Sequence, residues 1–185
     1  MNFARLILRA SVGGLFFGHG TQKLFGWFGG HGLDATGQAF EGLGLRPGRR
    51  HAVAAGISES AGGAALALGA ATPLAAASLT ATMLTAIDRV HFKNGPWVTN
   101  GGYEYNLVLI AAVLAIAETG PGPLSVDRAL GAERSGPAWA LAALVAGIIG
   151  YVGARVVNEA ELEAAQAPLA EAEEPSPAPA AAATE

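Results

Sequence analysis

The residues of this chain that could do chemistry are polar side chains set inside long apolar runs or at their ends. His19, Gln22 and Lys23 lie late in the first run, and Glu59 lies about two turns inside the second. Ionisable groups at that depth are costly, so they face the interior of a helix bundle and pair with one another. The later runs carry four further candidates: Asp88, His91, Glu104 and Asn106.

Helical spacing favours one shared site for these side chains. The three polar residues of the first run stand at i, i+3 and i+4, on one helix face, and Asp88 and His91 stand at i and i+3. Lys23 needs an anionic partner, and the sequence offers either Glu59 or Asp88. We therefore expect a polar pocket that is walled by three aromatic residues: Phe25, Trp27 and Trp97.

Several kinds of site are missing from the sequence. The chain has no cysteine, which excludes thiol–disulfide chemistry and thiolate metal sites within it. His19 and His91 are too few and too poorly spaced to predict a metal or haem site. The sequence shows no Ser-His-Asp order, phosphate-binding glycine loop or zinc signature, and no basic block that favours nucleic acid. We expect neither a metal nor a nucleic-acid partner.

Composition indicates that the elements carrying these residues are membrane helices. The chain has 185 residues, of which 51% are hydrophobic and only 14% charged, and its mean hydropathy is +0.37. Soluble domains are roughly a quarter charged. We expect the lipid bilayer as a partner and five helices that cross it, over residues 3–25, 52–71, 74–90, 103–117 and 137–157.

Alternating crossings would bring the polar candidates to one side of the membrane. If the first run begins at face A, the first and third runs end at face B, and the second and fourth begin there. All eight candidates then lie in the half of the bilayer next to face B. Gly14 and Gly18 form a small-xxx-small pair that lets another helix approach the first run closely. Arg5 and Arg9 are expected to reach the face-A interface.

The chain divides into four parts. Residues 1–120 are expected to form an all-α integral membrane four-helix bundle, with a short amphipathic helix over residues 34–45 on its surface. Residues 121–136 read as a polar linker and residues 137–157 as a fifth, peripheral transmembrane helix. Residues 158–185 hold seven acidic residues and no Lys or Arg, and they are rich in Ala, Glu and Pro. This composition predicts a disordered acidic tail. Because Ala and Glu favour helix, residues 159–167 are the part that could briefly extend the fifth helix.

Three segments together resemble the DoxX family of small bacterial membrane proteins. They are GHGTQKLFG at residues 18–26, the acid Glu59 followed by Gly62-Gly63, and the stretch from Asn94 that leads to GYEYNL at residues 102–107. The resemblance covers about residues 4–120. It implies a four-helix fold similar to that of the DoxD subunit associated with thiosulfate:quinone oxidoreductase. It also implies a multi-pass protein of the bacterial plasma (inner) membrane.

The resemblance carries a functional expectation as well. DoxX-like proteins are implicated in membrane-associated oxidoreductase complexes and in oxidative-stress responses. The chain would then be a non-catalytic or quinone-interacting subunit with oxidoreductase partner subunits. His19, Gln22 or Lys23 would hydrogen-bond the quinone carbonyls, and Glu59 would set the charge of Lys23 or relay a proton. Because the chain has no cysteine, a redox role would need a bound quinone, a partner subunit or another cofactor from outside.

Two other classes of function remain open from the residues. In the first, the chain is a structural or assembly protein whose buried polar pairs only fix helix register, and Glu104 and His91 are interfacial anchors. In the second, it is a small-solute transporter, although no internal repeat or broken helix points to one. Whether the chain is an enzyme is not decided. Seven Lys and Arg residues at face B against four at face A mildly favour face B as cytoplasmic.

Overall fold

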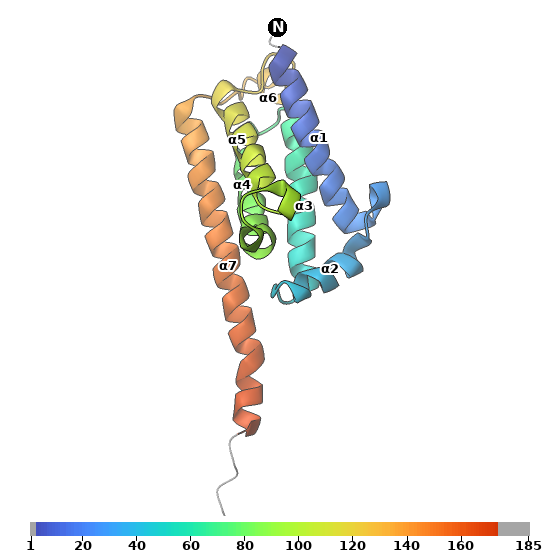
Figure 1. The fold of residues 1–185 in the computed structure, drawn as a ribbon. Helices are drawn as coiled ribbons and strands as arrows, with labels where there is room; N and C mark the ends of the chain where they lie inside the picture. The colour runs from blue at the N-terminus through green and yellow to red at the C-terminus, as the bar shows by residue number, and fades with distance from the viewer. Residues whose placement is uncertain (1–2, 174–185) are drawn as a thin grey trace, which may run out of the picture.

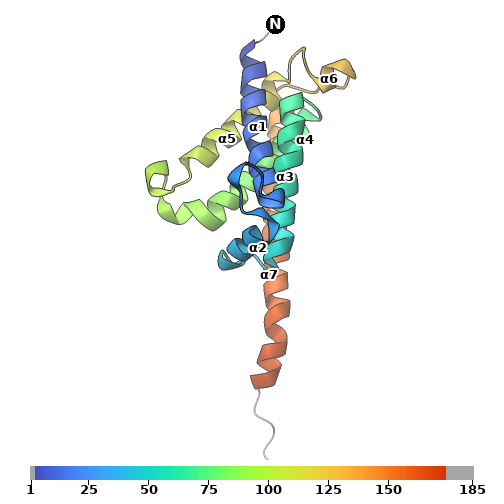
Figure 2. The same cartoon turned by 90° about the vertical axis from the view of Figure 1, so that its right-hand side faces the viewer.

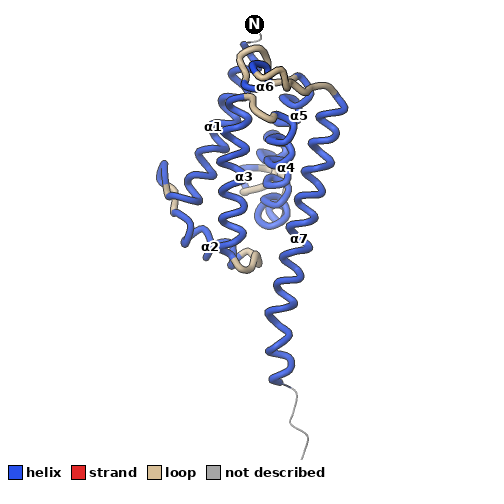
Figure 3. Tube along the Cα trace, turned by 180° about the vertical axis from the view of Figure 1, so that it is seen from behind, coloured by secondary structure: helices blue, strands red, loops and turns tan. Residues whose placement is uncertain are grey.

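Five helices form the body of the molecule, which we describe from a computed structural model (Figure 1). The structure describes the backbone of residues 3–173 and the side chains of residues 3–166. The described part of the chain is helical and contains no strand (Figure 3), so the predicted all-α class is confirmed. The five helices are α1 (Phe3–Phe25), α3 (Gly48–Leu68), α4 (Thr72–Ala86), α5 (Glu104–Thr119) and α7 (Pro137–Glu173).

Shorter elements connect these helices. A turn of 3₁₀ helix, η1 (Trp27–Gly29), leads into α2 (Gly32–Gly42), which agrees with the amphipathic helix predicted over residues 34–45. The connection from α4 to α5 projects to one side of the molecule (Figure 2). It contains the π-helix η2 and two 3₁₀ turns, whose bounds are η2 (Ile87–His91), η3 (Phe92–Asn94) and η4 (Val98–Asn100). The helix α6 (Val126–Ala129) lies near the N-terminal end of α1, which we call face A, and α2 lies toward the opposite end, face B (Figure 1).

Glycines let α1 and α3 pack backbone against backbone. A Cβ atom added to Gly13 would lie 2.5 Å from the carbonyl oxygen of Gly63, and one added to Gly20 would collide with the backbone of Gly56. Small residues at such positions allow the closest approach of two helices in a membrane. Gly14 and Gly18, the pair expected from the sequence, have no neighbour within 4 Å, so that prediction is wrong. The two residues lie on other faces of α1, because the buried face is set by Gly13, Phe16 and Gly20.

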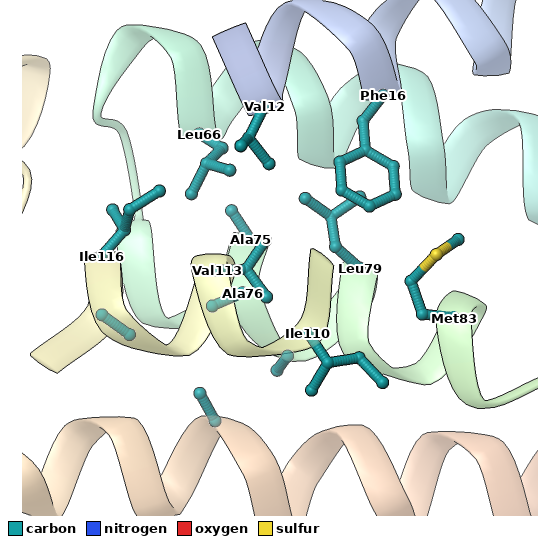
Figure 4. Close-up of a cluster of buried hydrophobic side chains, with 13 residues drawn as sticks. Val12, Phe16, Leu66, Ala75, Ala76, Leu79, Met83, Ile110, Val113 and Ile116 are labelled. Atoms are coloured by element: carbon teal, nitrogen blue, oxygen red, sulfur yellow. The ribbon is translucent and has the colours of Figure 1, made fainter. Parts of the chain in front are cut away.

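The apolar core joins all five long helices (Figure 4). Ala143 of α7 belongs to it, and a Cβ atom on Gly147 would lie 2.7 Å from the Thr80 side chain of α4. The helix α7 is therefore an integral part of the packing, and the expectation that it is peripheral is wrong. Small side chains at these positions give α7 its close contact with α4, a pattern that mean hydropathy does not reveal. The larger side chains of the core are Phe16, Leu66, Leu79, Met83, Ile110, Val113 and Ile116.

Two arginines of α1 hold the loop that follows α5 at face A. Arg9 is only 3% exposed and donates hydrogen bonds to the backbone carbonyls of Pro121, at 2.7 Å, and Leu124. Arg5 donates to the carbonyl of Thr119. The sequence predicted that both side chains would extend to the membrane interface, and the structure instead uses them inside the fold. Loop carbonyls have no helical partner, so the guanidinium groups satisfy them.

The predicted polar linker is a docked part of the fold. Asp127, on α6, is buried, and its carboxylate accepts hydrogen bonds from the backbone N–H groups of Ala71 at 2.7 Å and Thr72 at 3.0 Å. It also accepts one from the Thr72 hydroxyl at 2.8 Å. Residue 71 adopts a left-handed conformation (φ 45°), which is strained for alanine. Asp127 thus caps the N-terminus of α4, although it lies on α6, far along the chain.

The helix α7 continues well beyond the end predicted for it. The sequence predicted a disordered tail over residues 158–185, with a brief extension of the helix over residues 159–167 as the alternative, but α7 extends to Glu173. Asn158 is fully buried, and its amide oxygen accepts from the Arg46 backbone N–H at 2.9 Å while its amide nitrogen donates to the Gly44 carbonyl at 3.1 Å. These bonds anchor the helix to the loop after α2, and alanine and glutamate favour its continuation. Residues 174–185 of the predicted tail lie outside the described residues.

Helix length distinguishes α7 from the other predicted membrane crossings. Within the described residues, its segment Pro137–Gln166 is the one helix that is both long and apolar enough to cross a membrane. The helices α4 and α5 have 15 and 16 residues. At 1.5 Å per residue they are about 22–24 Å long, whereas a bilayer core is about 30 Å thick.

The contact between α1 and α3 predicts opposite effects of two matched substitutions. Gly20→Ala should lower the thermal midpoint of the purified protein, because overpacking costs about 1–3 kcal/mol and here the added methyl group meets backbone atoms. Gly14→Ala should leave it unchanged or raise it, since alanine favours helix by about 1 kcal/mol. The thermal midpoints of both variants are measured by heating the protein in detergent and monitoring the folded fraction by size-exclusion chromatography. Equal midpoints for the two variants would contradict the close contact.

Candidate functional site

A cavity of about 310 Å³ lies between the face-B halves of α3 and α4. The helices α1, α2 and α7, the loop after α2 and the π-helix η2 contribute the other residues of the wall. Most of the wall is apolar. The volume of the cavity falls at the lower end of the range of about 300–1,000 Å³ that is typical of small-molecule sites. The apolar lining includes Phe40, Leu43, Leu45, Ala55, Ala81 and Ala86.

An ion pair between α1 and α3 contributes to the cavity wall. The Lys23 Nζ lies 2.5 Å from the Glu59 Oε2 and 3.4 Å from the carbonyl oxygen of His19. Glu59 is 4% exposed, whereas the Lys23 side chain is 24% exposed. Of the two partners that the sequence offered to Lys23, the structure therefore uses Glu59. The close glycine contact between the two helices brings these side chains within reach, three residues beyond Gly20 on α1.

The π-helix η2 supplies a second cation to the cavity. Arg89 lines the wall, and its Nε lies 3.3 Å from the Asp88 Oδ2. The other oxygen of Asp88 lies 4.0 Å from the Arg155 guanidinium of α7. π-helical turns interrupt α-helices mostly at functional sites. No local pattern predicts an interruption here, because the residues of η2 are compatible with a regular helix.

His51 lines the same cavity and was not among the predicted site residues. Its Nε2 is buried without a hydrogen-bond partner and lies 3.7 Å from the Glu161 Oε2, which also has none. Burial lowers the pKa of the imidazole, a hydrogen bond to the Arg46 backbone opposes this, and the charges of Arg50 and Arg89 lower it further. The ring is therefore neutral at pH 7. The other oxygen of Glu161 accepts a hydrogen bond from Arg50.

A second, much smaller cavity of about 20 Å³ adjoins the first at His51. Its volume is close to that of one water molecule. Its lining includes the polar residues Thr85, Asp88, Arg89, Tyr151 and Arg155. His51 thus borders both cavities.

Hydroxyl groups tie α3 to α4 at the cavity. The Ser58 Oγ lies 2.7 Å from both the Ser78 Oγ and the Thr82 Oγ1. Ser58 and Thr82 line the cavity, but their hydroxyls already have partners within the protein. They therefore add polarity to the wall without an unsatisfied group.

Two predicted site residues of α1 lie outside the cavity lining. His19 is exposed, and its Nδ1 lies 3.1 Å from the Gln22 Oε1. The Gln22 amide donates to the carbonyl of Phe28 at 3.2 Å, so these side chains hold the turn η1 against the end of α1. They share a helix face with Lys23, as the spacing predicts. Of these three side chains, Lys23 is the one that forms an ion pair with α3.

The predicted residues of the α4–α5 connection also serve other contacts. The His91 Nδ1 lies 2.7 Å from the Gly101 carbonyl oxygen, and Glu104 accepts a hydrogen bond from the Val98 backbone N–H at 2.7 Å. Asn106 is buried beside Met83, 3.5 Å from its sulfur. The three side chains shape this connection and the core next to it. They do not line the cavity with Lys23 and Glu59.

The three aromatic residues expected to wall the pocket do not line it. Phe25, Trp27 and Trp97 are 61%, 52% and 62% exposed. The chain turns outward at Gly26, whose φ of 72° ends α1, and this directs the rings to the surface. Exposed aromatic side chains at a helix end suit a membrane interface. The aromatic residue that lines the cavity is Phe40 of α2.

Sequence reasoning also missed the contributions of α7. Gly150 and Ala154 line the cavity, and Asn158 and Glu161 fix the helix at face B. A single asparagine after an apolar run and a glutamate in an Ala/Glu-rich stretch carry no signal of their contacts. Among the described residues, no group of three or more His, Asp or Glu is placed to hold a metal ion.

The different exposure of Lys23 and Glu59 makes the ion pair testable. Lys23→Met leaves a buried carboxylate without its cation, which for buried pairs costs up to about 3–5 kcal/mol. Glu59→Leu should cost less, because the partly exposed Lys23 can turn toward solvent. The double variant should recover most of the stability of the wild type. Thermal midpoints measure all three, and a double variant less stable than Lys23→Met would refute the pairing.

Comparison with known proteins agrees with the motifs of the first half of the chain. Residues 4–92 match the family model of DoxX. The match ends before residues 94–107, so it does not include the third motif. Searches of curated proteins and of solved structures find no match. The resemblance drawn from the sequence is thus confirmed over residues 4–92, and this part of the chain is a DoxX domain, which is typical of membrane proteins.

Proposed function

We propose that this chain is a multi-pass protein of the bacterial plasma membrane whose cavity binds the headgroup of a quinone-type molecule. In this proposal the chain is the membrane subunit of an oxidoreductase assembly. The observation that carries it is the cavity of about 310 Å³, which combines an apolar wall with the Lys23–Glu59 ion pair. Such a combination of apolar surface and few polar groups is typical of small-molecule sites.

The outer surface of the helices supports several membrane crossings. Large apolar side chains on three different helices are between 49% and 66% exposed, which is costly in water and favourable in lipid. Most of the charged side chains within the helices pair with one another or with loop carbonyls. The exposed side chains are Ile7 and Leu15 of α1, Leu107 and Val108 of α5, and Ile149 of α7.

The polar groups of the cavity suit a quinone headgroup. The ring and its substituents would pack against the apolar wall, and Lys23, His51 or Arg89 would hydrogen-bond the ring oxygens. When bound, a quinone supplies the capacity to carry electrons and protons, which the chain itself lacks. Glu59 would hold the Lys23 ammonium group in place beside the ring through their ion pair.

One observation favours a second candidate function, in which the chain is structural. The glycine contact between α1 and α3 and the Lys23–Glu59 pair would together be enough to lock the helices in register. The cavity would then be a packing defect. Filling it would raise stability and change nothing else.

A cavity-filling variant separates the two candidates. The full chain in lipid nanodiscs should bind a short-chain ubiquinone saturably, and Ala55→Phe should weaken that binding roughly tenfold or more by occupying the cavity. Ala111→Phe is the matched control, because residue 111 is exposed on α5 and does not line the cavity. Equilibrium dialysis against empty nanodiscs measures the binding. Equal binding by Ala55→Phe and wild type, or none above empty nanodiscs, would favour the structural function.

A further inference from the structure

The charged side chains of the cavity wall leave a net positive charge. Three side chains of the wall carry a fixed charge, and they are Lys23, Glu59 and Arg89. Glu59 balances Lys23 through the ion pair at 2.5 Å, so Arg89 has no anionic counterpart in the wall. Protonation of His51, the other ionisable residue of the wall, would only add positive charge. An apolar cavity with one unbalanced cation favours a ligand that carries the missing negative charge.

Asp88, the neighbour of Arg89 on η2, neutralises it only in part. Its Oδ2 approaches the Arg89 guanidinium at Nε, at 3.3 Å, which is longer than the usual N–H···O hydrogen bond. Its Oδ1 lies 4.0 Å from the Arg155 guanidinium, so two arginines share one carboxylate. Asp88 lines the small cavity but not the large one, whereas Arg89 lines both. The cluster of these three residues therefore also keeps a net positive charge.

The Arg89 guanidinium still has donors to offer to a ligand. Its two Nη groups carry four of the five N–H donors of the side chain. These groups have no hydrogen-bond acceptor among the described residues, and they are not fully buried, since the side chain is 21% exposed. By contrast, the hydroxyls of Ser58, Thr82 and Thr85 are bonded inside the protein, and Lys23 already donates to two acceptors. Arg89 is thus the side chain of the wall with the most donors left for a headgroup.

We propose that Arg89 binds a negatively charged headgroup, so that among quinone-type molecules the cavity selects those whose ring carries an ionised hydroxyl group. Such a ring has a delocalised oxyanion next to a carbonyl oxygen, and a planar guanidinium can donate parallel hydrogen bonds to two neighbouring oxygens. Hydrogen bonds that involve ionised groups are roughly twice as strong as those between neutral groups, so the anion is favoured over the uncharged quinone. The apolar part of the molecule packs against Phe40, Leu43 and Ala55. This inference rests on the proposed function, since it names the class of headgroup that the same cavity takes.

Two probes of similar shape test the preference for a charged headgroup. They are 2-hydroxy-3-pentyl-1,4-naphthoquinone, which is ionised at neutral pH, and 2-methyl-3-pentyl-1,4-naphthoquinone, which is uncharged. The full chain in phosphatidylcholine nanodiscs should bind the ionised probe roughly tenfold more tightly, as measured by equilibrium dialysis against empty nanodiscs. Arg89→Met should bring the ratio of the two affinities close to one. Lys93→Met is the matched control and should keep the wild-type ratio, because it removes an exposed cation of the same connection that does not line the cavity.

The outcomes separate this inference from the proposed function. If both probes bind saturably and Ala55→Phe blocks both, but the wild type binds the two equally, the cavity takes ligands and only the preference for an anion is wrong. A preference that survives in Arg89→Met overturns the assignment to Arg89. If neither probe binds above empty nanodiscs, or Ala55→Phe binds both like the wild type, the inference and the proposed function fail together.

The test does not depend on a single variant. The comparison of the two probes on the wild type decides the preference for an anion without any substitution. Arg89→Gln removes the charge but keeps a polar side chain, and it should lower the ratio as Arg89→Met does. If one of these two variants fails to fold, the other remains decisive for the role of Arg89.

Discussion

The close contact of α1 with α3 is the constraint on which the rest of the structure depends. Glycines on both helices remove the side chains that would hold the backbones apart, and Gly13 and Gly63 mark one end of this contact. At that separation a lysine on one helix reaches a buried carboxylate on the other, and Lys23 and Glu59 meet at 2.5 Å. Bulkier residues at the contact would leave both charges without a partner at a depth where an unpaired charge is expensive. Packing and electrostatics therefore act together in this helix pair.

The cavity exists because other elements do not close around this pair. The π-helical turn η2 directs Arg89 toward α3, and the small residues Gly150 and Ala154 of α7 leave space where larger side chains would fill it. Residues 4–92, which match the DoxX family, supply the walls from α1 to η2. The helix α7 lies outside that match and supplies the remaining wall. Asn158 anchors it to the loop after α2, so a segment beyond the family match completes the site.

The two functional readings share this geometry and differ in what the cavity is for. If the chain is structural, the glycine contact and the ion pair are sufficient to hold the helices in register, and the cavity beside them has no role. As a binding site, the cavity combines an apolar wall with the Lys23–Glu59 ion pair, which is the pattern of a small-molecule site. The apolar surface on α1, α5 and α7 fits both readings, since each places the chain in lipid. The proposed site lies at face B, where a headgroup could reach it from the bilayer.

By itself, the sequence determined the helical class, the approximate position of the long helices, the membrane character and the DoxX domain of residues 4–92. It did so because apolar runs, turn residues and short motifs are local signals. It also limited the partner of Lys23 to two acids. The tertiary structure alone decided between those acids, moved the glycine contact from Gly14 and Gly18 to Gly13 and Gly20, and buried Arg9 and Asp127 in loop contacts. It brought His51 and Arg89 to one cavity, placed Glu161 beside His51, and left Phe25, Trp27 and Trp97 exposed at the surface. These features depend on helix rotation, on one π-helical turn and on contacts between residues more than a hundred positions apart, none of which leaves a local pattern in the chain.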